Sequence, residues 1–182
     1  MQEKVGELIR NWKCRNIEGI FCENKDQAHN GILQLVPEDA SVGFCGSQTL
    51  EQLEVIEMLE SRGNRVYNHY APDLSRDESL RIRKLGAQAD YFLTSANAIS
   101  VKGEMVFFSA YGHRTAGIAD AKHVIVVAGV NKITGSLEAA LDRARNYVTP
   151  LNCKRLKWDT QCLRTGTCHN YECVGPEYNR MC

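Results

Sequence analysis

Four cysteines, Cys162, Cys168, Cys173 and Cys182, recur in the C-terminal segment of residues 162–182, among glycine, proline and polar residues. A short segment of this composition cannot offset the loss of backbone entropy, about 1–2 kcal/mol per residue, by burying apolar side chains. A metal ion or cluster bound by the thiolates would stabilise it, because binding free energy then becomes folding free energy. The pattern therefore predicts a metal-binding C-terminal segment.

The spacing of these cysteines leaves the kind of metal open. Structural zinc sites usually contain cysteine pairs two to four residues apart, and only Cys168 and Cys173, with four residues between them, fit that rule. Iron–sulfur clusters are also held by cysteine thiolates, and the irregular gaps favour a cluster over zinc. Disulfides rank third, because we expect a reducing compartment. We expect His169 to be a bystander.

The overall composition is that of a globular protein. The chain has 182 residues, of which 43% are hydrophobic and 24% charged, and its formal net charge is zero. A neutral chain gives no reason to expect nucleic acid or an anionic membrane as a partner. The first residues are charged throughout and no window is as long and apolar as a membrane span, so we expect a cytoplasmic location without a signal peptide.

Residues 1–150 alternate predicted helices and strands, which is typical of an α/β domain with a mostly parallel sheet flanked by helices. Residues 98–108 form one antiparallel hairpin in this scheme. Residues 123–128, the most apolar run, should form a central strand buried on both faces. We therefore predict an α/β domain, 1–150, and a cysteine-rich segment, 151–182. The other expected strands cover 19–22, 41–45, 65–67 and 90–94, and the expected helices 5–12, 26–37, 48–61, 75–85 and 137–144, the last closed by Pro150.

Polar loops follow the predicted parallel strands at their carboxyl ends, where α/β sheets bind ligands. Arg114 could hold a carboxylate or phosphate at two points, although a solvated loop is an equal interpretation. The turn at residues 46–49 could offer backbone N–H groups to an anion, but an ordinary strand-to-helix turn is the more common case. It lacks the lysine of a P-loop. The candidate ligand-binding residues in these loops are Gly46, Ser47, Thr49, Asn97, Gly112, Arg114, Asn131 and Lys132.

Three side chains are candidates for catalysis. His113 could transfer protons near neutral pH. Glu104 could act as a base or nucleophile, although a glutamate in a surface turn is the commoner case. Cys45 could be a reactive thiol because it precedes a predicted helix N-terminus, although a buried strand cysteine is the commoner case. The sequence names these candidates without selecting a reaction.

Several of these segments, in the same order along the chain, resemble the LUD-domain family of lactate-utilisation proteins. The resemblance implies the α/β fold shared with ribose-5-phosphate isomerase, glucosamine-6-phosphate deaminase and coenzyme A transferases. The segments that carry it are Gly46–Leu50, Asn97–Ile99, the Gly103-Glu104 hairpin, Gly112–Arg114, Val130–Ile133 and Asn152–Arg155.

One branch of that family ends in a cysteine motif, which implies a [4Fe-4S] cluster on Cys162, Cys168, Cys173 and Cys182. The motif also includes a Thr-Gly pair, a proline and an arginine, which match Thr165-Gly166, Pro176 and Arg180. Here the middle cysteines are separated by four residues instead of two, and the last gap is longer. His113 stands where the family usually has asparagine. Cys45 and Cys153 stand where it has glycine and alanine, which makes them candidate additional ligands.

We therefore expect an iron–sulfur protein that binds a small anionic metabolite and acts in electron transfer or cluster-assisted chemistry of organic acids such as lactate. Its expected partners are an electron-transfer protein and a second copy of the chain. The alternative is a non-redox binding or regulatory subunit whose C-terminal segment holds structural zinc. A transferase or isomerase rests on the fold analogy alone.

Overall fold

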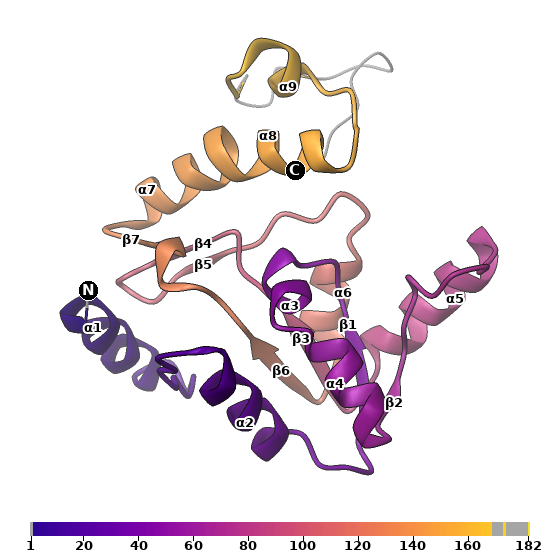
Figure 1. Ribbon diagram of the computed structural model, residues 1–182. Helices are drawn as coiled ribbons and strands as arrows, with labels where there is room; N and C mark the ends of the chain where they lie inside the picture. Colours follow the sequence, from indigo (N-terminus) through magenta and orange to yellow (C-terminus); the bar gives the residue numbers. More distant parts are fainter. Residues whose placement is uncertain (1, 169–172, 174–181) are drawn as a thin grey trace. The chain divides into compact units, whose positions relative to one another are not determined.

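The computed structural model describes residues 2–168, 173 and 182 (Figure 1). Contacts divide the chain into two compact units. Unit 1 contains residues 1–19, 96–110 and 130–182, and unit 2 contains residues 20–95 and 111–129. The cysteine-rich segment 151–182 therefore falls within unit 1. His169, Pro176 and Arg180 lie outside the described residues.

Unit 2 is built on a four-stranded parallel sheet, which confirms the predicted α/β class with a mostly parallel sheet. Its strand order is β2-β1-β3-β6. Val42 is in register with Val66 on one side and with Tyr91 on the other. The carboxyl ends of the strands thus meet at one edge, as a ligand-binding α/β sheet requires. The strands are β1 (Ser41–Phe44), β2 (Arg65–Val66), β3 (Tyr91–Thr94) and β6 (His123–Val126).

Helices cover both faces of this sheet. Val42 and Phe44 point to one face, where they pack in the core with residues of α2 (Lys25–Leu35), α3 (Gln48–Gln52) and α4 (Val55–Arg62). Gly43 points to the opposite face, which α5 (Arg76–Ala87) and α6 (His113–Asp120) cover. A Cβ atom at Gly43 would overlap the Gly86 carbonyl oxygen of α5. The absence of a side chain there lets α5 lie directly on the strand.

Local sequence signals set several helix ends in unit 2. The Ser75 hydroxyl accepts from the Glu78 backbone N–H (3.3 Å), and the Glu78 carboxylate accepts from the Ser75 N–H (2.9 Å), so the predicted capping box is present. Gly63 ends α4 with φ 98°, as predicted. The predicted single helix 48–61 is instead two helices, because Glu54 takes a left-handed conformation (φ 51°) between them.

Unit 1 combines a small sheet with helices. The predicted hairpin is confirmed as β4 (Ala98–Ser100) and β5 (Met105–Val106), which pair antiparallel. A short strand, β7 (Ile133–Thr134), adds parallel to β4. Ala98 and Val106 pack with Ala140 and Ala144 in the core of this unit. The helices are α1 (Gln2–Lys13), the 3₁₀ helix η1 (Val130–Lys132), α7 (Leu137–Asp142), the π-helix η2 (Arg143–Val148), α8 (Thr149–Arg155) and α9 (Gln161–Thr165).

Three further predictions about the elements are wrong. Residues 19–22 form no strand; Gly19 instead lies against Ile9 and Trp12 of α1, where a Cβ would come within 3.0 Å of both side chains. The run 123–128 is not central, because β6 is the last strand in the order of the described sheet and Val124 is exposed. Pro150 does not close the last helix. It lies in the first turn of α8, where no donor is required, and the helical path continues to Arg155.

No helix among the described residues is both long enough and apolar enough to span a membrane.

Candidate functional site

The carboxyl end of β1 brings predicted site residues together in unit 2. Cys45 follows β1, and its Sγ lies 2.9 Å from the Thr94 hydroxyl at the end of β3. Arg114, in the first turn of α6, donates from Nε to Cys45 Sγ (3.2 Å) and from Nη2 to the Gly46 carbonyl (3.0 Å). Cys45, Gly46 and Arg114 therefore form one contact group at the edge where parallel sheets bind ligands.

Two histidines lie close together in the same unit. His69 follows β2 and is only 4% exposed. Its ring contacts those of Tyr70 (4.1 Å between centroids) and His113 (5.9 Å, edge-on). Burial, and next the positive charge of Arg83, lower the pKa of each histidine to about 4. Both imidazoles are therefore neutral at neutral pH.

Three nitrogens of this group are buried without a hydrogen-bond partner among the described residues: His69 Nε2, Arg83 Nε and His113 Nδ1. The Arg83 guanidinium also lies over the Tyr111 ring, 5.7 Å from its centroid. Buried polar groups in folded proteins are normally hydrogen-bonded. We call His69, Arg83 and His113 the donor cluster.

The turn after β1 also carries the predicted residues Ser47 and Thr49. The Ser47 hydroxyl caps α3 by accepting from the Leu50 N–H (3.3 Å). The Thr49 hydroxyl accepts from the Ser95 hydroxyl at 3.5 Å. These side chains therefore serve the strand-to-helix turn.

The remaining predicted ligand-binding residues belong to unit 1. The side-chain oxygen of Asn97 accepts from the Phe108 N–H (2.8 Å), and its carbonyl accepts from Arg143 (3.0 Å). Asn131 and Lys132 lie in η1, directly before β7. The predicted ligand-binding residues are thus divided between two units.

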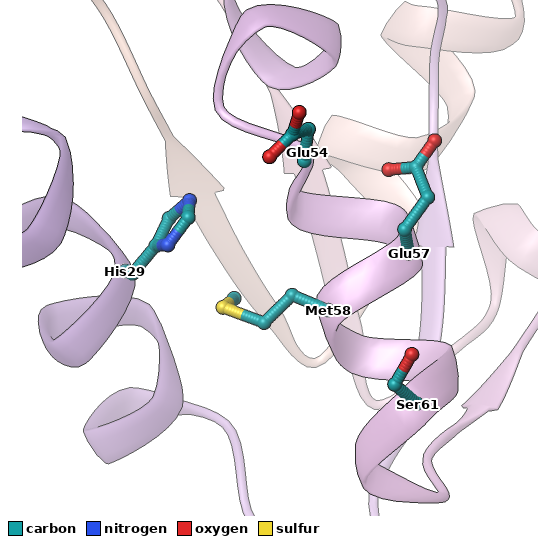
Figure 2. A pocket seen from close by; sticks show the side chains of 5 residues that line it. All are labelled: His29, Glu54, Glu57, Met58 and Ser61. Atoms are coloured by element: carbon teal, nitrogen blue, oxygen red, sulfur yellow. The ribbon is translucent and has the colours of Figure 1, made fainter.

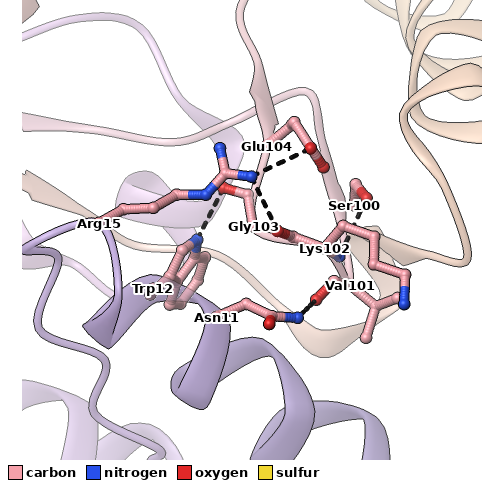
Figure 3. Close-up of polar contacts among 8 residues, drawn as sticks. All are labelled: Asn11, Trp12, Arg15, Ser100, Val101, Lys102, Gly103 and Glu104. Atoms are coloured by element: carbon pink, nitrogen blue, oxygen red, sulfur yellow. Dashed lines mark hydrogen bonds and ion pairs between the residues drawn. The ribbon is translucent and has the colours of Figure 1, made fainter.

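Glu104 lies in the hairpin of unit 1, against α1 (Figure 3). Its Oε1 accepts from Arg15 (3.2 Å). Trp12 Nε1 donates to the Gly103 carbonyl (3.0 Å) and Asn11 Nδ2 to the Val101 carbonyl (2.8 Å), so α1 clasps the hairpin. The pKa of Glu104 is lowered by hydrogen bonds from the Ser100 hydroxyl and the backbone and by the nearby Arg15. Its Oε2 atom has no hydrogen bond of normal geometry to any described residue.

Each of the eight cysteines is a free thiol. Cys153 is fully buried in α8. Burial raises the pKa of its thiol, Thr160 lowers it, and the nearby thiols of Cys162 and Cys182 raise it further. Cys162, in α9, lies 3.4 Å from the Thr160 hydroxyl. Cys153 is therefore a neighbour of two of the predicted ligands.

The other two predicted ligands are half-buried. The Cys168 N–H donates to the Asn146 side chain (3.0 Å). Within residues 2–168, 173 and 182, no three His, Cys, Asp or Glu side chains converge closely enough to hold a metal ion. Ligation of a metal by these cysteines stays a prediction.

The model of the LUD domain family matches residues 5–175, which is most of the chain. The chain belongs to the LUD-domain family. The match ends before Cys182, so the branch with the C-terminal cysteine motif stays a prediction. No curated protein and no solved structure matches the chain.

The LUD domain also has a pocket of about 400 Å³ between α2 and α4 (Figure 2). The His29 ring hydrogen-bonds to the Leu53 carbonyl, and Glu54 pairs with Lys25 (2.9 Å). None of the residues predicted to bind ligand or metal lines this pocket. Its lining residues are His29, Glu54, Glu57, Met58 and Ser61.

Sequence reasoning missed two members of the donor cluster in this LUD domain. His69 lies just beyond β2, so the rule that selected loops at strand ends could have found it. Arg83 lies within α5 and has no comparable local signal. Only the packing of α5 against α6 brings it near His113.

Proposed function

We propose that this LUD-domain protein binds a small anionic metabolite through unit 2 and carries a metal centre on the C-terminal thiols of unit 1. The first part is carried by one observation. Near the carboxyl end of a parallel sheet, burial lowers the pKa of two histidines, His69 and His113, and positive charge lowers it further: that of Arg83 at both and that of Arg114 at His113. A local excess of positive charge in a poorly hydrated place favours an anion.

The ligand class is a small carboxylate or a phosphorylated small molecule. Guanidinium groups bind both through charge-assisted hydrogen bonds. Because the family is named for lactate utilisation, lactate is the first carboxylate to test.

Isothermal titration with lactate and with inorganic phosphate tests the anion proposal. We expect Arg114→Gln to weaken binding by about tenfold or more. Arg76→Gln, an exposed residue at the start of α5, is the matched control and should bind as the wild type does. Absence of binding to the wild-type protein, with either anion, would overturn the proposal.

The second part, a thiolate-bound metal centre, is supported by the neighbourhood of Cys153, Cys162 and Cys182 in unit 1. Thiols are the donors that iron–sulfur clusters and structural zinc require, so the donor set fits both. Cys162, Cys168, Cys173 and Cys182 would hold the centre, with Cys153 as a further candidate. An iron–sulfur cluster would supply one-electron transfer, and with it a role for an electron-transfer partner. Zinc would make the protein a non-redox binding or regulatory subunit.

Purification without oxygen, followed by iron, sulfide and zinc analysis, separates these alternatives. Iron with sulfide, and visible absorbance that bleaches with dithionite, would support the cluster. Zinc without a spectral change would support the regulatory alternative. We expect Cys162→Ser to lose the metal and Cys14→Ser, an exposed thiol of unit 1, to keep it. A wild-type protein without metal would contradict the metal centre and leave the anion proposal untouched.

A further inference from the structure

The donor cluster is the strongest feature of unit 2 that its own packing does not explain. His69 Nε2, Arg83 Nε and His113 Nδ1 are buried and have no hydrogen-bond partner among the described residues. One such nitrogen could reflect local misfit. Three in one group indicate a shared partner that the described residues do not supply.

The three nitrogens belong to side chains that lie near one another although they are far apart in the sequence. The His69 and His113 rings are 5.9 Å apart, and the charge of Arg83 acts on both. The parallel sheet and the contact between α5 and α6 produce this arrangement. A single small anion bound there could therefore accept from Arg83 and His113, and also from His69 in its protonated form, because the other ring nitrogen of His69 is already hydrogen-bonded to the Tyr67 backbone.

The charges around the cluster select an anion. Arg83 and Arg114 both act on His113, so a metal cation would be repelled. Gly112, with φ 72°, is the N-cap of α6, and His113 is the first residue of the helix. The N-terminal N–H groups of this eight-residue helix add positive potential at the same place. Arginine, histidine N–H and helix N–H groups are together the donors that oxyanions prefer.

We propose that His69, Arg83 and His113 form a binding site for the phosphate or carboxylate group of a small metabolite. This inference rests on the proposed anion binding by unit 2, and it assigns that binding to His113 together with His69 and Arg83, which the sequence had not indicated. Arg114 is fixed beside the site by Cys45 and Gly46. It adds charge, and the donor cluster makes the contacts.

Phosphate and lactate titrations of the full chain, purified without oxygen, test the inference. Arg83→Gln and His69→Gln should each weaken binding of the preferred anion by about tenfold to a hundredfold, the usual effect of losing a hydrogen bond to a charged group. Arg81→Gln removes the same charge from an exposed position two residues earlier on α5. It should bind within about twofold of the wild type, because exposed charges contribute little. The anion that binds more tightly identifies the ligand class.

Nuclear magnetic resonance of the wild-type imidazoles provides a second measurement, which needs no variant. The His69 and His113 ring signals should shift in proportion to anion binding. Either of two results would overturn the donor cluster and leave the proposed anion binding intact. The first is imidazole signals that do not shift at saturation with the anion. The second is wild-type affinity in folded Arg83→Gln and His69→Gln variants while Arg114→Gln loses binding. No binding by the wild type would overturn both.

Discussion

The contacts of Asn11, Trp12 and Arg15 of the α1 segment with the β4–β5 hairpin, which we call the hairpin clasp, differ from the donor cluster of unit 2. Both consist of polar side chains, but only in the clasp does each of them find a hydrogen-bond partner within the described chain. In the clasp, Trp12, Asn11 and Arg15 each donate to an acceptor on the hairpin. In the cluster, three buried nitrogens have no hydrogen-bond partner among the described residues. A donor network closed by the chain itself contributes to stability, whereas one left open has its hydrogen bonds available for a ligand. The comparison separates residues that hold the LUD domain together from residues that we expect to act.

The largest expected effect on stability comes from Gly43, which allows α5, and with it Arg83, to pack directly on the sheet. Gly43→Ala would place a methyl group into the Gly86 carbonyl oxygen. Because the Gly86 carbonyl belongs to the main chain of α5 and cannot rotate away, we expect a loss of about 3 kcal/mol or more in the free energy of unfolding, measured by urea denaturation. Gly31→Ala, with open space around its Cβ position in α2, should be neutral or stabilising. Equal stability of the two variants would contradict the seating of α5.

Opening the clasp should cost less. Trp12→Ala removes the hydrogen bond to the Gly103 carbonyl and the ring that packs on Gly19. We expect a loss of about 2 kcal/mol in the free energy of unfolding, since the ring is only partly buried. Anion affinity, measured on the folded variant by titration, should not change. A tenfold loss of affinity would show that clasp and cluster are not separable in function.

The donor cluster should make stability depend on pH. The pKa of His69 and of His113 falls from 6.5 to about 4 on folding, so the unfolded chain binds more protons between these values. The free energy of unfolding is therefore unaffected by the two histidines above about pH 6.5 and decreases as the pH falls toward 4. We expect a total decrease on the order of 1–2 kcal/mol for His69 and His113 together, after allowance for their partial exposure to solvent.

Urea denaturation across this pH range measures the loss. The double variant His69→Gln, His113→Gln should show a smaller dependence on pH than the wild type. Bound phosphate should reduce the loss in the wild type, because an anion stabilises protonated imidazole. An unchanged slope in the double variant would rule out the histidines as its source.

The smallest effect is expected at the ion pair of the clasp. Arg15 and Glu104 are partly exposed, with side chains 49% and 30% accessible. Glu104→Gln should therefore change stability by less than about 1 kcal/mol. The proposed catalytic role of Glu104 predicts, in contrast, a large loss of any activity found. A loss of activity with unchanged stability would support Glu104 as a catalytic residue.

Local signals in the sequence predicted what local physics controls. The capping box at Ser75, the helix end at Gly63 and the β4–β5 hairpin all follow from a few adjacent residues. The left-handed residue Glu54 has no such signal, and the position of β6 in the sheet depends on pairing between distant segments. Apolar content alone therefore placed residues 123–128 wrongly at the centre.

The candidate site shows the same division. Cys45, Gly46 and Arg114 could be found because they follow strands or precede a helix in the sequence. Arg83 could not, because its role depends on which face of α5 meets α6. The polar loops of the two units looked equivalent in the sequence, since nothing local reveals that the chain passes from one unit to the other.

Because each unit is built from separate segments of the chain, its folding during biosynthesis is affected. The hairpin acceptors that α1 needs lie about 90 residues further along the chain, so a nascent α1 leaves the ribosome long before its partner exists. Unit 2 likewise lacks α6 and β6 until residue 129 has been synthesised, because the hairpin of unit 1 is inserted between its two segments. Folding during translation must therefore wait for sequence-distant contacts, which are slow to form. Ribosome-bound intermediates of this protein should expose the apolar face of α1 to chaperones.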